Sequence, residues 1–447
     1  MRFLISTACA AVAMSALAHE LSAQPGTNVP VATVRTVGRA AVSLGSVLNL
    51  FELERGRVIV NDGAARRVVI LDSALANVTV VLDSVSGVSG SYGAVATPMI
   101  AYGRDSLLFT DGVSRALLVI DRAGKTHGVM AGPSGPDFRF LAGGFWGADA
   151  KGNFVYRVMN VRTSSNPPGE RGPGSQQIQQ IPDSSTLVRF NVDARRVDTL
   201  LQIAQEGRTR MIVAQDLDGK RSMTYEINPL ATVDEWTVLA DGSLAVVRGS
   251  DYHVEIHRAG APPTVGPKVP FAWRRLSDED KARFVDSVRT SFDNARRAAD
   301  ARGEDPTREV IRLLRGVSGA IAATMPAPQP SAPRAPNAAP PLPMAITFVD
   351  AKTLPDYYPA FRAGSVRADL DNNVWVLPST TTAANGGGLV YDVIDDRGVL
   401  RRRVQLPVGR SIAGFGRNGV VYLMSREANG QWIVERGAYD ARDGKGP

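Results

Sequence analysis

The chain alternates short runs of β-branched and aromatic residues with polar turns that contain Gly, Asp or Asn. A turn followed by such a run occurs six times. Continuous apolar runs of this length, bounded by turn residues, predict strands that are buried on both faces. The six runs begin at Val58, Leu107, Phe154, Leu244, Val374 and Val420.

In several copies a second strand follows and ends in a hairpin, at 68–72, 117–121 and 390–395, for example. Gly124 and Gly398 supply the positive φ that a tight hairpin requires. A further strand then completes an antiparallel unit. Such a unit leaves two apolar faces exposed, and a radial arrangement of units buries both.

The spacing of the runs therefore predicts an all-β fold, a six-bladed β-propeller spanning residues 30–447. Two steps between runs are too long for one blade and contain insertions. The first insertion, 162–182, is rich in Gly, Pro, Ser and Gln, and we interpret it as a loop. Residues 202–228 add a hairpin at Asp218-Gly219, and if they formed a degraded blade the count would be seven.

The second insertion, 275–345, predicts a helix followed by a Pro/Ala-rich linker at 325–343 that runs extended. Ser277 is a helix N-cap, and three acidic residues follow it. Asp305 begins a second helix. We expect the first helix to cover one propeller face or the second helix, with a partner or the channel as alternatives. Its apolar stripe comprises Phe284, Val288, Phe292, Ala295 and Ala299.

The N-terminus has the features of a secretory signal peptide at residues 1–23. Arg2 precedes an apolar stretch at 3–17, Ala16-Leu17-Ala18 offers a cleavage site, and Ser22-Ala23 before Gln24 offers a second one. We expect a periplasmic or secreted protein with no stable membrane span after cleavage. If the segment stayed uncleaved, the chain would be a sensor-like ectodomain. Cys9, the single cysteine, lies in this segment, so the mature chain would contain no disulfide.

The net charge of +7 is spread along the chain and defines no nucleic-acid site, so we expect no nucleic-acid partner. The one dense basic run, Arg401-Arg402-Arg403, lies in a predicted strand, and we interpret it as a solvated sheet edge.

The repeat resembles the six-bladed propellers of the NHL and TolB-like kind, including exported bacterial proteins. Two segments carry the resemblance, 354–359 (LPDYYP) and 367–376 (RADLDNNVWV). They resemble l-P-d-y-x-P followed by D-x-D-G-x-l-W-V, with Asn373 where that pattern prefers Gly. The resemblance implies a propeller fold and leaves the function open, because propellers host enzymes, receptors and scaffolds alike.

Candidate binding residues lie at equivalent ends of the repeated runs. Asp62, Asp111, Arg157 and Arg248 would give the propeller a mixed acidic and basic mouth if they line one rim, although turn-stabilising and solvated roles explain each of them as well. Two further candidates, Tyr357 and Tyr358, lie in a turn between prolines, where one of them would be an exposed anchor for a partner.

The sequence predicts no cofactor and no metal site. His253 and His257 flank a predicted strand, where positions i and i+4 lie about 13 Å apart. A lactonase-like propeller hydrolase with a metal in its channel is the alternative function, but Asn49 and Glu52 lack the E-G-P context of that family. Our first interpretation is an exported binding or scaffold module for a protein, peptide or glycan.

Overall fold

The computed structural model describes most of the chain. It covers residues 29–84, 91–93, 97–103, 106–111, 116–132, 146–158, 162–167, 172–205, 209–301, 344–379 and 387–440. The predicted signal peptide, Cys9, the helix predicted from Asp305 and the Pro/Ala-rich linker at 325–343 all lie outside these ranges.

In the described part of the chain, six antiparallel units of four strands follow one another, and we number them blades 1 to 6; a fifth, parallel strand extends one of them. Blade 1 contains β3 (Leu50–Glu52), β4 (Val58–Asp62), β5 (Arg67–Leu71) and β6 (Val78–Leu82). Blade 2 contains β7 (Ile100–Tyr102), β8 (Ser106–Asp111), β9 (Ala116–Asp121) and β10 (Thr126–Ala131). Blade 3 contains β11 (Trp146–Ala148), β12 (Phe154–Val158), β15 (Ser184–Asn191) and β16 (Arg196–Ala204).

The second half of the chain forms the other three blades. Blade 4 contains β19 (Glu235–Val238), β20 (Leu244–Arg248), β21 (His253–His257) and β22 (Thr264–Val265). Blade 5 contains β24 (Phe361–Ala368), β25 (Val374–Pro378), β26 (Val390–Ile394) and β27 (Leu400–Gln405). Blade 6 contains β28 (Ser411–Phe415), β29 (Val420–Arg426) and β30 (Trp432–Ala438). Its fourth strand is β2 (Arg35–Arg39), from the opposite end of the chain.

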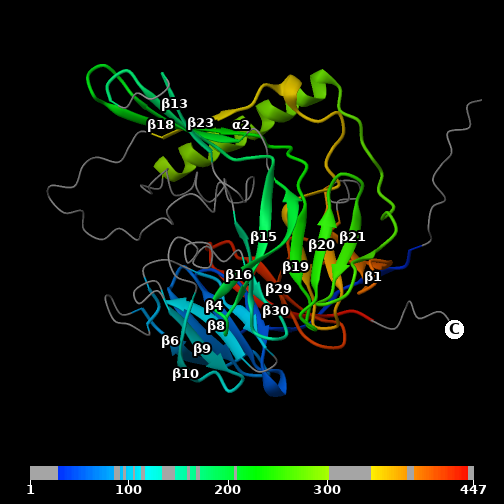
Figure 1. Cartoon of the computed structure of the whole chain (residues 1–447). Helices are drawn as coiled ribbons and strands as arrows, with labels where there is room; N and C mark the ends of the chain where they lie inside the picture. Colours follow the sequence, from blue (N-terminus) through cyan, green and yellow to red (C-terminus); the bar gives the residue numbers. More distant parts are fainter. Residues whose placement is uncertain are drawn as a thin grey trace, which may run out of the picture.

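Each blade shares a hydrophobic cluster with the next. Ile59 of blade 1 and Phe109 of blade 2 belong to one such cluster. The last cluster returns to the start, because it joins Tyr422 of blade 6 to Val58 of blade 1. The other four junctions have clusters of their own. The six sheets therefore form a closed ring, and the predicted β-propeller is confirmed (Figure 1).

The six repeated runs are the second strands of the six blades, β4, β8, β12, β20, β25 and β29. Val58 and Val60 point into the cluster shared with blade 6, whereas Ile59 points into the cluster shared with blade 2. All five residues of β4 are buried. A strand packed on both faces needs apolar side chains at every position, which explains why the runs are continuous rather than alternating.

The turn before each of two second strands is held by an aspartate. Asp369 Oδ1 accepts hydrogen bonds from the backbone N–H groups of Asp371 and Asn373, at 2.9 and 2.8 Å. Its Oδ2 accepts from the Trp375 indole at 2.8 Å. The residue with positive φ is Asn372 (61°), so Asn372, not Asn373, occupies the glycine-like position. Asp149 binds the backbone of its own turn in the same way.

The two ends of the described chain meet. β2 pairs with β30, so an N-terminal strand completes the last blade. β1 (Val31–Thr33) pairs in parallel with β27, which carries the basic run 401–403. The prediction of a solvated edge there is wrong, because β1 covers β27, and Arg401 and Arg403 pair with Asp395 and Asp392.

A seventh sheet stands off the ring, in the order β13-β14-β17-β18-β23. Residues 162–182 are not a loop, because they contain the first two of these strands, and residues 202–228 contribute the next two rather than a blade. The hairpin at Asp218-Gly219 is confirmed, with φ 80° at the glycine. The strands are β13 (Arg162–Asn166), β14 (Gln176–Gln180), β17 (Arg210–Gln215), β18 (Arg221–Ile227) and β23 (Met344–Phe348).

The helix α2 (Asp278–Ala301) packs on this seventh sheet. The Ser277 hydroxyl accepts from the Asp280 N–H, and the Asp280 carboxylate accepts from the Ser277 N–H, both at 3.1 Å, which caps the helix as predicted. The Phe292 ring lies 5.9 Å from the Phe348 ring of β23. Phe292 also belongs to the cluster shared by blades 2 and 3, so this layer and the ring have one continuous core. The short helices are η1 (Glu54–Gly56) and η3 (Ala351–Thr353).

Candidate functional site

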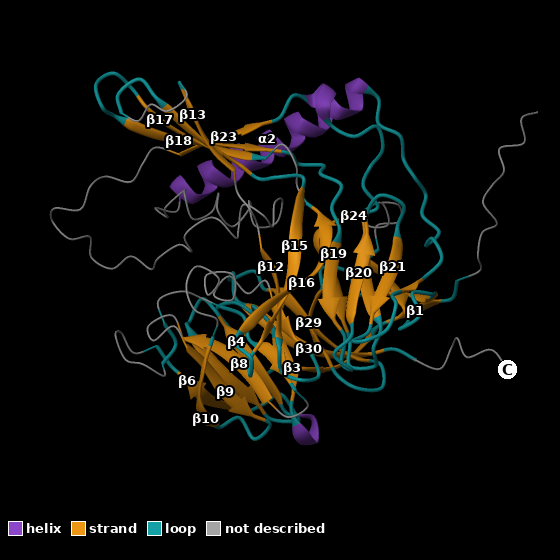
Figure 2. Ribbon diagram, in the orientation of Figure 1, coloured by secondary structure: helices purple, strands orange, loops and turns teal. Residues whose placement is uncertain are grey.

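All the added elements leave the ring on one face. In a blade whose four strands alternate in direction, the connections after the second and fourth strands emerge on the same side. β13 and β14 follow the second strand of blade 3, whereas β17 and β18 follow its fourth strand. α2 and β23 follow the fourth strand of blade 4. Figure 2 shows the seventh sheet and the helix as a layer over this side, which we name the insertion face.

The six candidate residues predicted from sequence also belong to this face by their position in the chain, but they do not form one site. Asp62 is fully buried, and its carboxylate accepts from the backbone N–H groups of Gly45 and Ser46, at 3.1 and 2.9 Å. It also pairs with Arg67 at 3.3 Å. Asp62 therefore fixes the loop into β3. Asp111 is the last residue of β8, and Arg157 is buried in β12.

Arg248 is engaged inside blade 4. Its guanidinium pairs with Asp234 at 2.8 Å and with Glu255 at 2.9 Å. Glu255 also lies between the two histidines of β21, 3.4 Å from His253 and 3.1 Å from His257. Burial raises the pKa of Glu255, but the hydrogen bonds from Arg248 and His257 outweigh it and lower that pKa. The cluster holds its own charges together and leaves Arg248 no free edge for a ligand.

Tyr357 and Tyr358 lie where the second insertion returns to the ring. Their segment runs antiparallel to residues 273–276: Tyr358 N–H donates to the Arg274 carbonyl at 3.0 Å, and Leu276 N–H donates to that of Asp356 at 2.8 Å. Tyr357 is 47% exposed. Tyr358 points the other way and meets the Phe284 ring of α2 edge-on, at 6.1 Å. One of the two tyrosines is thus an exposed side chain, and the other is part of the packing.

The exposed aromatic side chains come together at this point. Among the side chains whose burial the structure describes, Trp273 (40% exposed) and Tyr357 are the two exposed aromatic ones. They lie on the paired segments just described, because Arg275 forms an antiparallel bridge with Tyr357. Aromatic side chains with one face in solvent are typical of binding surfaces.

Two arginines flank the packed aromatic pair. The Arg274 guanidinium lies 5.3 Å from the Tyr358 ring centroid, and the Arg362 guanidinium lies 5.6 Å from that of Phe284. The four side chains form a row of cation, ring, ring and cation. Stacking holds each guanidinium by its face and leaves its N–H edge available.

The carboxylates nearby are already paired with other cations. Lys281, whose side chain is almost fully buried, forms an ion pair with Asp356 at 2.7 Å. Arg283 forms one with Asp280 at 2.7 Å. Asp278 and Glu279 pair with the same two cations. In the part of the chain that the structure describes, no carboxylate lies at ion-pair distance from Arg274, Arg275 or Arg362. We name Trp273, Arg274, Arg275, Tyr357, Tyr358, Phe284 and Arg362 the aromatic–basic patch, in which Arg274, Tyr358, Phe284 and Arg362 lie on the opposite side of the paired segments from Tyr357.

Sequence reasoning identified the two tyrosines but missed the rest of the patch. Phe284 was predicted only as a core residue of the helix. The segment Trp273-Arg274-Arg275 directly before the Ser277 cap is the signal that was available, because aromatic and basic residues in a connecting segment are candidates for binding. Arg362 had no signal at all, since only the packing of α2 brings it next to Phe284.

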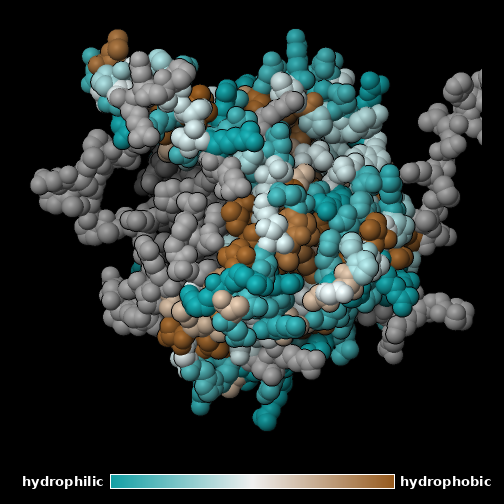
Figure 3. All heavy atoms as spheres, viewed as in Figure 1, coloured by the Kyte–Doolittle hydropathy of each residue, from teal (hydrophilic) through white to brown (hydrophobic). Residues whose placement is uncertain are grey.

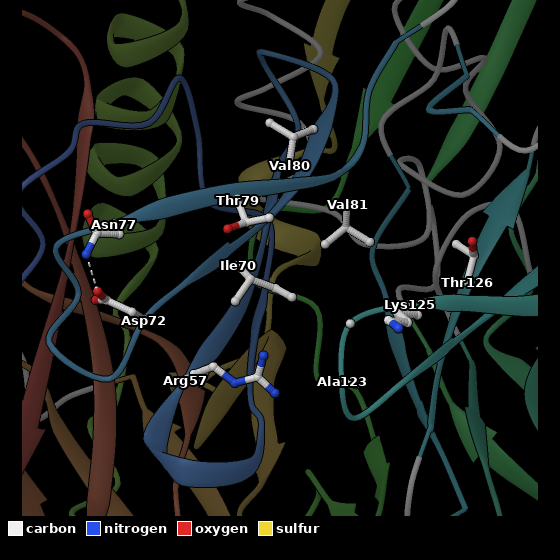
Figure 4. A pocket seen from close by; sticks show the side chains of 11 residues that line it. Arg57, Ile70, Asp72, Asn77, Thr79, Val80, Val81, Ala123, Lys125 and Thr126 are labelled. Carbon is white, nitrogen blue, oxygen red and sulfur yellow. Dashed lines mark hydrogen bonds between the residues drawn. The ribbon is translucent and has the colours of Figure 1, made fainter.

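The ring itself also contains a cavity. A cavity of about 460 Å³ separates β5 and β6 from the hairpin of β9 and β10, with Arg57, Ile70 and Lys125 in its lining. Arg57 donates to the Arg122 carbonyl at 3.3 Å, and Figure 4 shows the hydrogen bond from Asn77 to Asp72 at one end. Its polar groups thus serve the hairpins of two neighbouring blades, and we interpret it as a groove between blades.

Neither Asn49 nor Glu52, the residues weighed for a channel metal, points a free group into the channel. The Asn49 amide exchanges hydrogen bonds with the Met99 backbone. Glu52 accepts from the Tyr422 hydroxyl at 2.8 Å and from the Arg417 N–H at 3.2 Å. No group of three or more His, Cys, Asp or Glu side chains within the described ranges is placed to hold a metal ion.

Figure 3 shows a mostly hydrophilic face on which small hydrophobic areas are separated by polar side chains. None of the helices in the described part of the chain combines the length and the apolar character needed to cross a bilayer.

No family model matches the chain, and no curated protein is similar to it in sequence. The similar solved structures are β-propeller-type proteins. Virginiamycin B lyase from Staphylococcus aureus is 9% identical, with 90% of this chain and 98% of that chain covered and a TM-score of 0.34. A DUF4221 family member from Bacteroides vulgatus is 10% identical, with 91% and 98% covered and a TM-score of 0.36. Similarity at this level gives no information on function.

Proposed function

We propose that the protein is an exported β-propeller of the NHL and TolB-like type that acts as a binding module for a protein, peptide or glycan. The aromatic–basic patch on the insertion face would be its binding site. One observation carries the proposal: the two exposed aromatic side chains of the described surface lie on neighbouring paired segments, near arginines that have no carboxylate at ion-pair distance among the described residues.

The layer that presents the patch supports this role. The ring closes through its own six clusters, and no blade lacks a strand that the insertions would supply. Three connections on one side were nevertheless extended into a sheet and a helix. Binding residues are commonly carried by such connections on a rigid scaffold.

Defined ligands on glycan and peptide arrays test the proposal. We expect the wild-type protein to bind a subset of probes, and the double variant Trp273→Ala/Tyr357→Ala to lose that binding while its melting temperature stays unchanged. Val129→Ala, an exposed position on β10, is the matched control. Retention of the same probes by the double variant would exclude the patch as the binding site.

Export is a separate part of the proposal. We expect the protein to be recovered from the periplasm or the medium with an N-terminus that begins after residue 18 or residue 23. N-terminal sequencing of the native protein measures this. An intact Met1 on the recovered protein would contradict cleavage and favour a membrane-anchored ectodomain.

A further inference from the structure

We propose that the outer edge of blade 1 binds an extended peptide segment of a partner protein, in which β-branched residues alternate with acidic ones. The peptide would pair with β6 as a fifth strand of the blade and place its acidic side chains in the groove beside β6. This site is separate from the aromatic–basic patch. The groove includes the hairpins after β5 and β9, which emerge on the side of the ring opposite the insertion face.

The strand β6 is an edge strand that lacks the usual protection against pairing. It pairs with β5 on one side, and the described part of the chain places no strand on its other side. Its sequence, Val-Thr-Val-Val-Leu, consists of β-branched residues and one leucine, without charge or proline. Val78 is 36% exposed and Val80 is 48% exposed. An uncovered apolar edge of this kind is a template for another strand.

The outer strands of the other five blades are covered, charged or short. β27 is covered by β1. β16 carries Arg196 and Asp198, and β10 carries His127 beside Asp121. β22 has two residues, and β2 has an arginine at each end. Edge strands avoid unwanted pairing by these same means, so β6 differs from its equivalents in the described ring.

Blade 5 demonstrates that an outer edge of this ring accepts a fifth strand. β1 pairs in parallel with β27, where Val31 lies opposite Arg403 and Thr33 opposite Gln405. The added strand comes from the far end of the chain, so it joins the sheet as an extended segment and not through a hairpin. β6 has the same place in blade 1, which makes an extended segment the occupant that its edge suits.

The register of β6 divides the side chains of an added strand into two sets. Val78 and Val80 lie on the side of the sheet that packs toward blade 6. Thr79 lies opposite Ile70, on the side toward blade 2 and the groove. Side chains of an added strand alternate between the same two sides. One set therefore lies beside the exposed valines, which favours β-branched residues, and the other set faces the groove.

The groove favours acidic side chains. Arg57 and Lys125 line it, and no carboxylate in the described part of the chain lies at ion-pair distance from either. The Arg57 guanidinium donates to two backbone carbonyls, at 3.4 and 3.3 Å. Asp72, the carboxylate in the lining, accepts from the Ala76 N–H at 2.8 Å and from the Asn77 amide at 2.6 Å (Figure 4). Asp72 thus closes its own hairpin and leaves the two cations to a ligand.

The same charges argue against a second copy of this chain as the occupant. Two β6 strands paired edge to edge would supply no carboxylate to either groove. They would also bring two sets of Arg57 and Lys125 toward each other, and like charges oppose association. A partner with acidic residues complements these charges instead.

Fluorescence anisotropy on the full mature chain tests the inference with labelled peptides. The probe is a short peptide in which valine alternates with glutamate, and one control has lysine in place of glutamate. Two further controls carry backbone N-methyl groups, at the valines in one and at the glutamates in the other. Only alternate N–H groups of a strand face a given neighbour, so one of these two should lose binding. We expect the probe to bind, and the lysine peptide and that N-methylated form to bind at least about tenfold more weakly.

A charge reversal assigns the acidic side chains to the groove. Lys125→Glu should weaken binding of the valine–glutamate peptide by about tenfold and strengthen binding of the valine–lysine peptide. Lys220→Glu on the seventh sheet is the matched control. The two lysines end the same kind of turn, because the Lys125 N–H donates to Asp121 at 2.8 Å and the Lys220 N–H donates to Asp216 at 2.7 Å.

A charge on the edge strand assigns the peptide to β6. Val80→Glu should weaken binding of the probe by about tenfold, because it places a carboxylate where the valines of the peptide lie. Val197→Glu, at a similarly exposed valine of the outer strand β16, should leave binding unchanged. Circular dichroism and melting temperature verify that each variant folds.

The outcomes separate this site from the aromatic–basic patch. The double variant Trp273→Ala/Tyr357→Ala should bind the probe as the wild type does, and a loss there would assign the peptide to the patch and overturn the edge site. Absence of probe binding, equal binding of the lysine peptide, or full binding of both N-methylated forms overturns the inference as well. A dimer in sedimentation velocity that Val80→Glu dissociates, without probe binding, would identify a second copy as the occupant.

Discussion

The ring and the layer above it were built in different ways. Blades 1 to 5 each take their four antiparallel strands in sequence order, blade 3 with an insertion, and only blade 6 uses a strand, β2, from the other end of the chain. The second strand of blade 1 is buried at all five positions. The seventh sheet takes strands from three separate segments, and its strands β13 and β14 are polar and exposed or partly exposed. Local pattern thus specifies the ring, whereas the layer depends on contacts between distant segments.

This difference explains where side chains remain available for binding. A buried blade residue has neighbours on every side, so Asp62 and Trp375 are engaged within or between blades, and the partly buried Arg248 is paired within blade 4. The layer contacts the ring along one side, so its connecting segments are able to leave aromatic and basic groups in solvent. Four predictions test whether the two regions differ as described.

The largest effect is expected in the ring. Trp375→Ala should lower the free energy of unfolding by about 3–5 kcal/mol, because it empties a fully buried site shared by blades 5 and 6 and removes one of the two side-chain hydrogen bonds to Asp369 Oδ2. Denaturant unfolding at equilibrium measures this. Trp273→Ala is the matched control and should cost less than about 1 kcal/mol, since that indole is partly exposed. Similar losses for the two variants would contradict the comparison.

A core substitution in the layer should act more locally. Phe292→Ala removes the α2 ring that packs on Phe348 and should cost about 3 kcal/mol of local stability. Hydrogen exchange should accelerate in α2, β18 and β23, while β4 and β25 keep their protection. Ser291→Ala, on the exposed side of the helix, is the control. Equal acceleration in β25 would show that the layer and the ring unfold as one unit.

Substitutions at two equivalent hairpin glycines distinguish the stability cost of backbone strain from the cost of a steric clash between blades. Gly124 and Gly260 both have positive φ, at 82° and 75°. A Cβ at Gly124 would collide with the Ile70 side chain of blade 1, whereas a Cβ at Gly260 would meet open space. We expect Gly124→Ala to cost about 2 kcal/mol and Gly260→Ala about 1 kcal/mol. Thermal unfolding compares them, and equal shifts would exclude a role for the contact with Ile70.

The smallest effect concerns the ion pair that holds the patch. The Lys281 ammonium lowers the pKa of Asp356, so this carboxylate contributes stability above its unfolded pKa, near 4, and loses it as the pH falls through the folded value. Asp356→Asn should therefore reduce the exchange protection of 273–276 and the first turn of α2 at pH 7. At pH 3 the variant and the wild type should become more alike. Asp286→Asn, on the exposed side of α2, should leave this region unchanged at both pH values.

The local pattern of residues was sufficient to identify the repeated strands and the start of the helix. The six runs are the six second strands because a strand buried on both faces leaves a continuous apolar signal. Ser277 and Asp280 cap α2 because the required groups lie three residues apart in sequence. The hairpin at Gly219 was predictable for the same reason.

Tertiary structure decided the rest. The run Gln176-Gln177-Ile178-Gln179-Gln180 has no strand pattern, and it becomes β14 only because β13 and β17 pair with it on both sides. Likewise β2 and β1 find their partners at the far end of the chain. The aromatic–basic patch joins residues from α2, from the segment before it and from the entry to β24. No local rule relates positions so far apart, because their proximity is set by packing and not by the backbone between them.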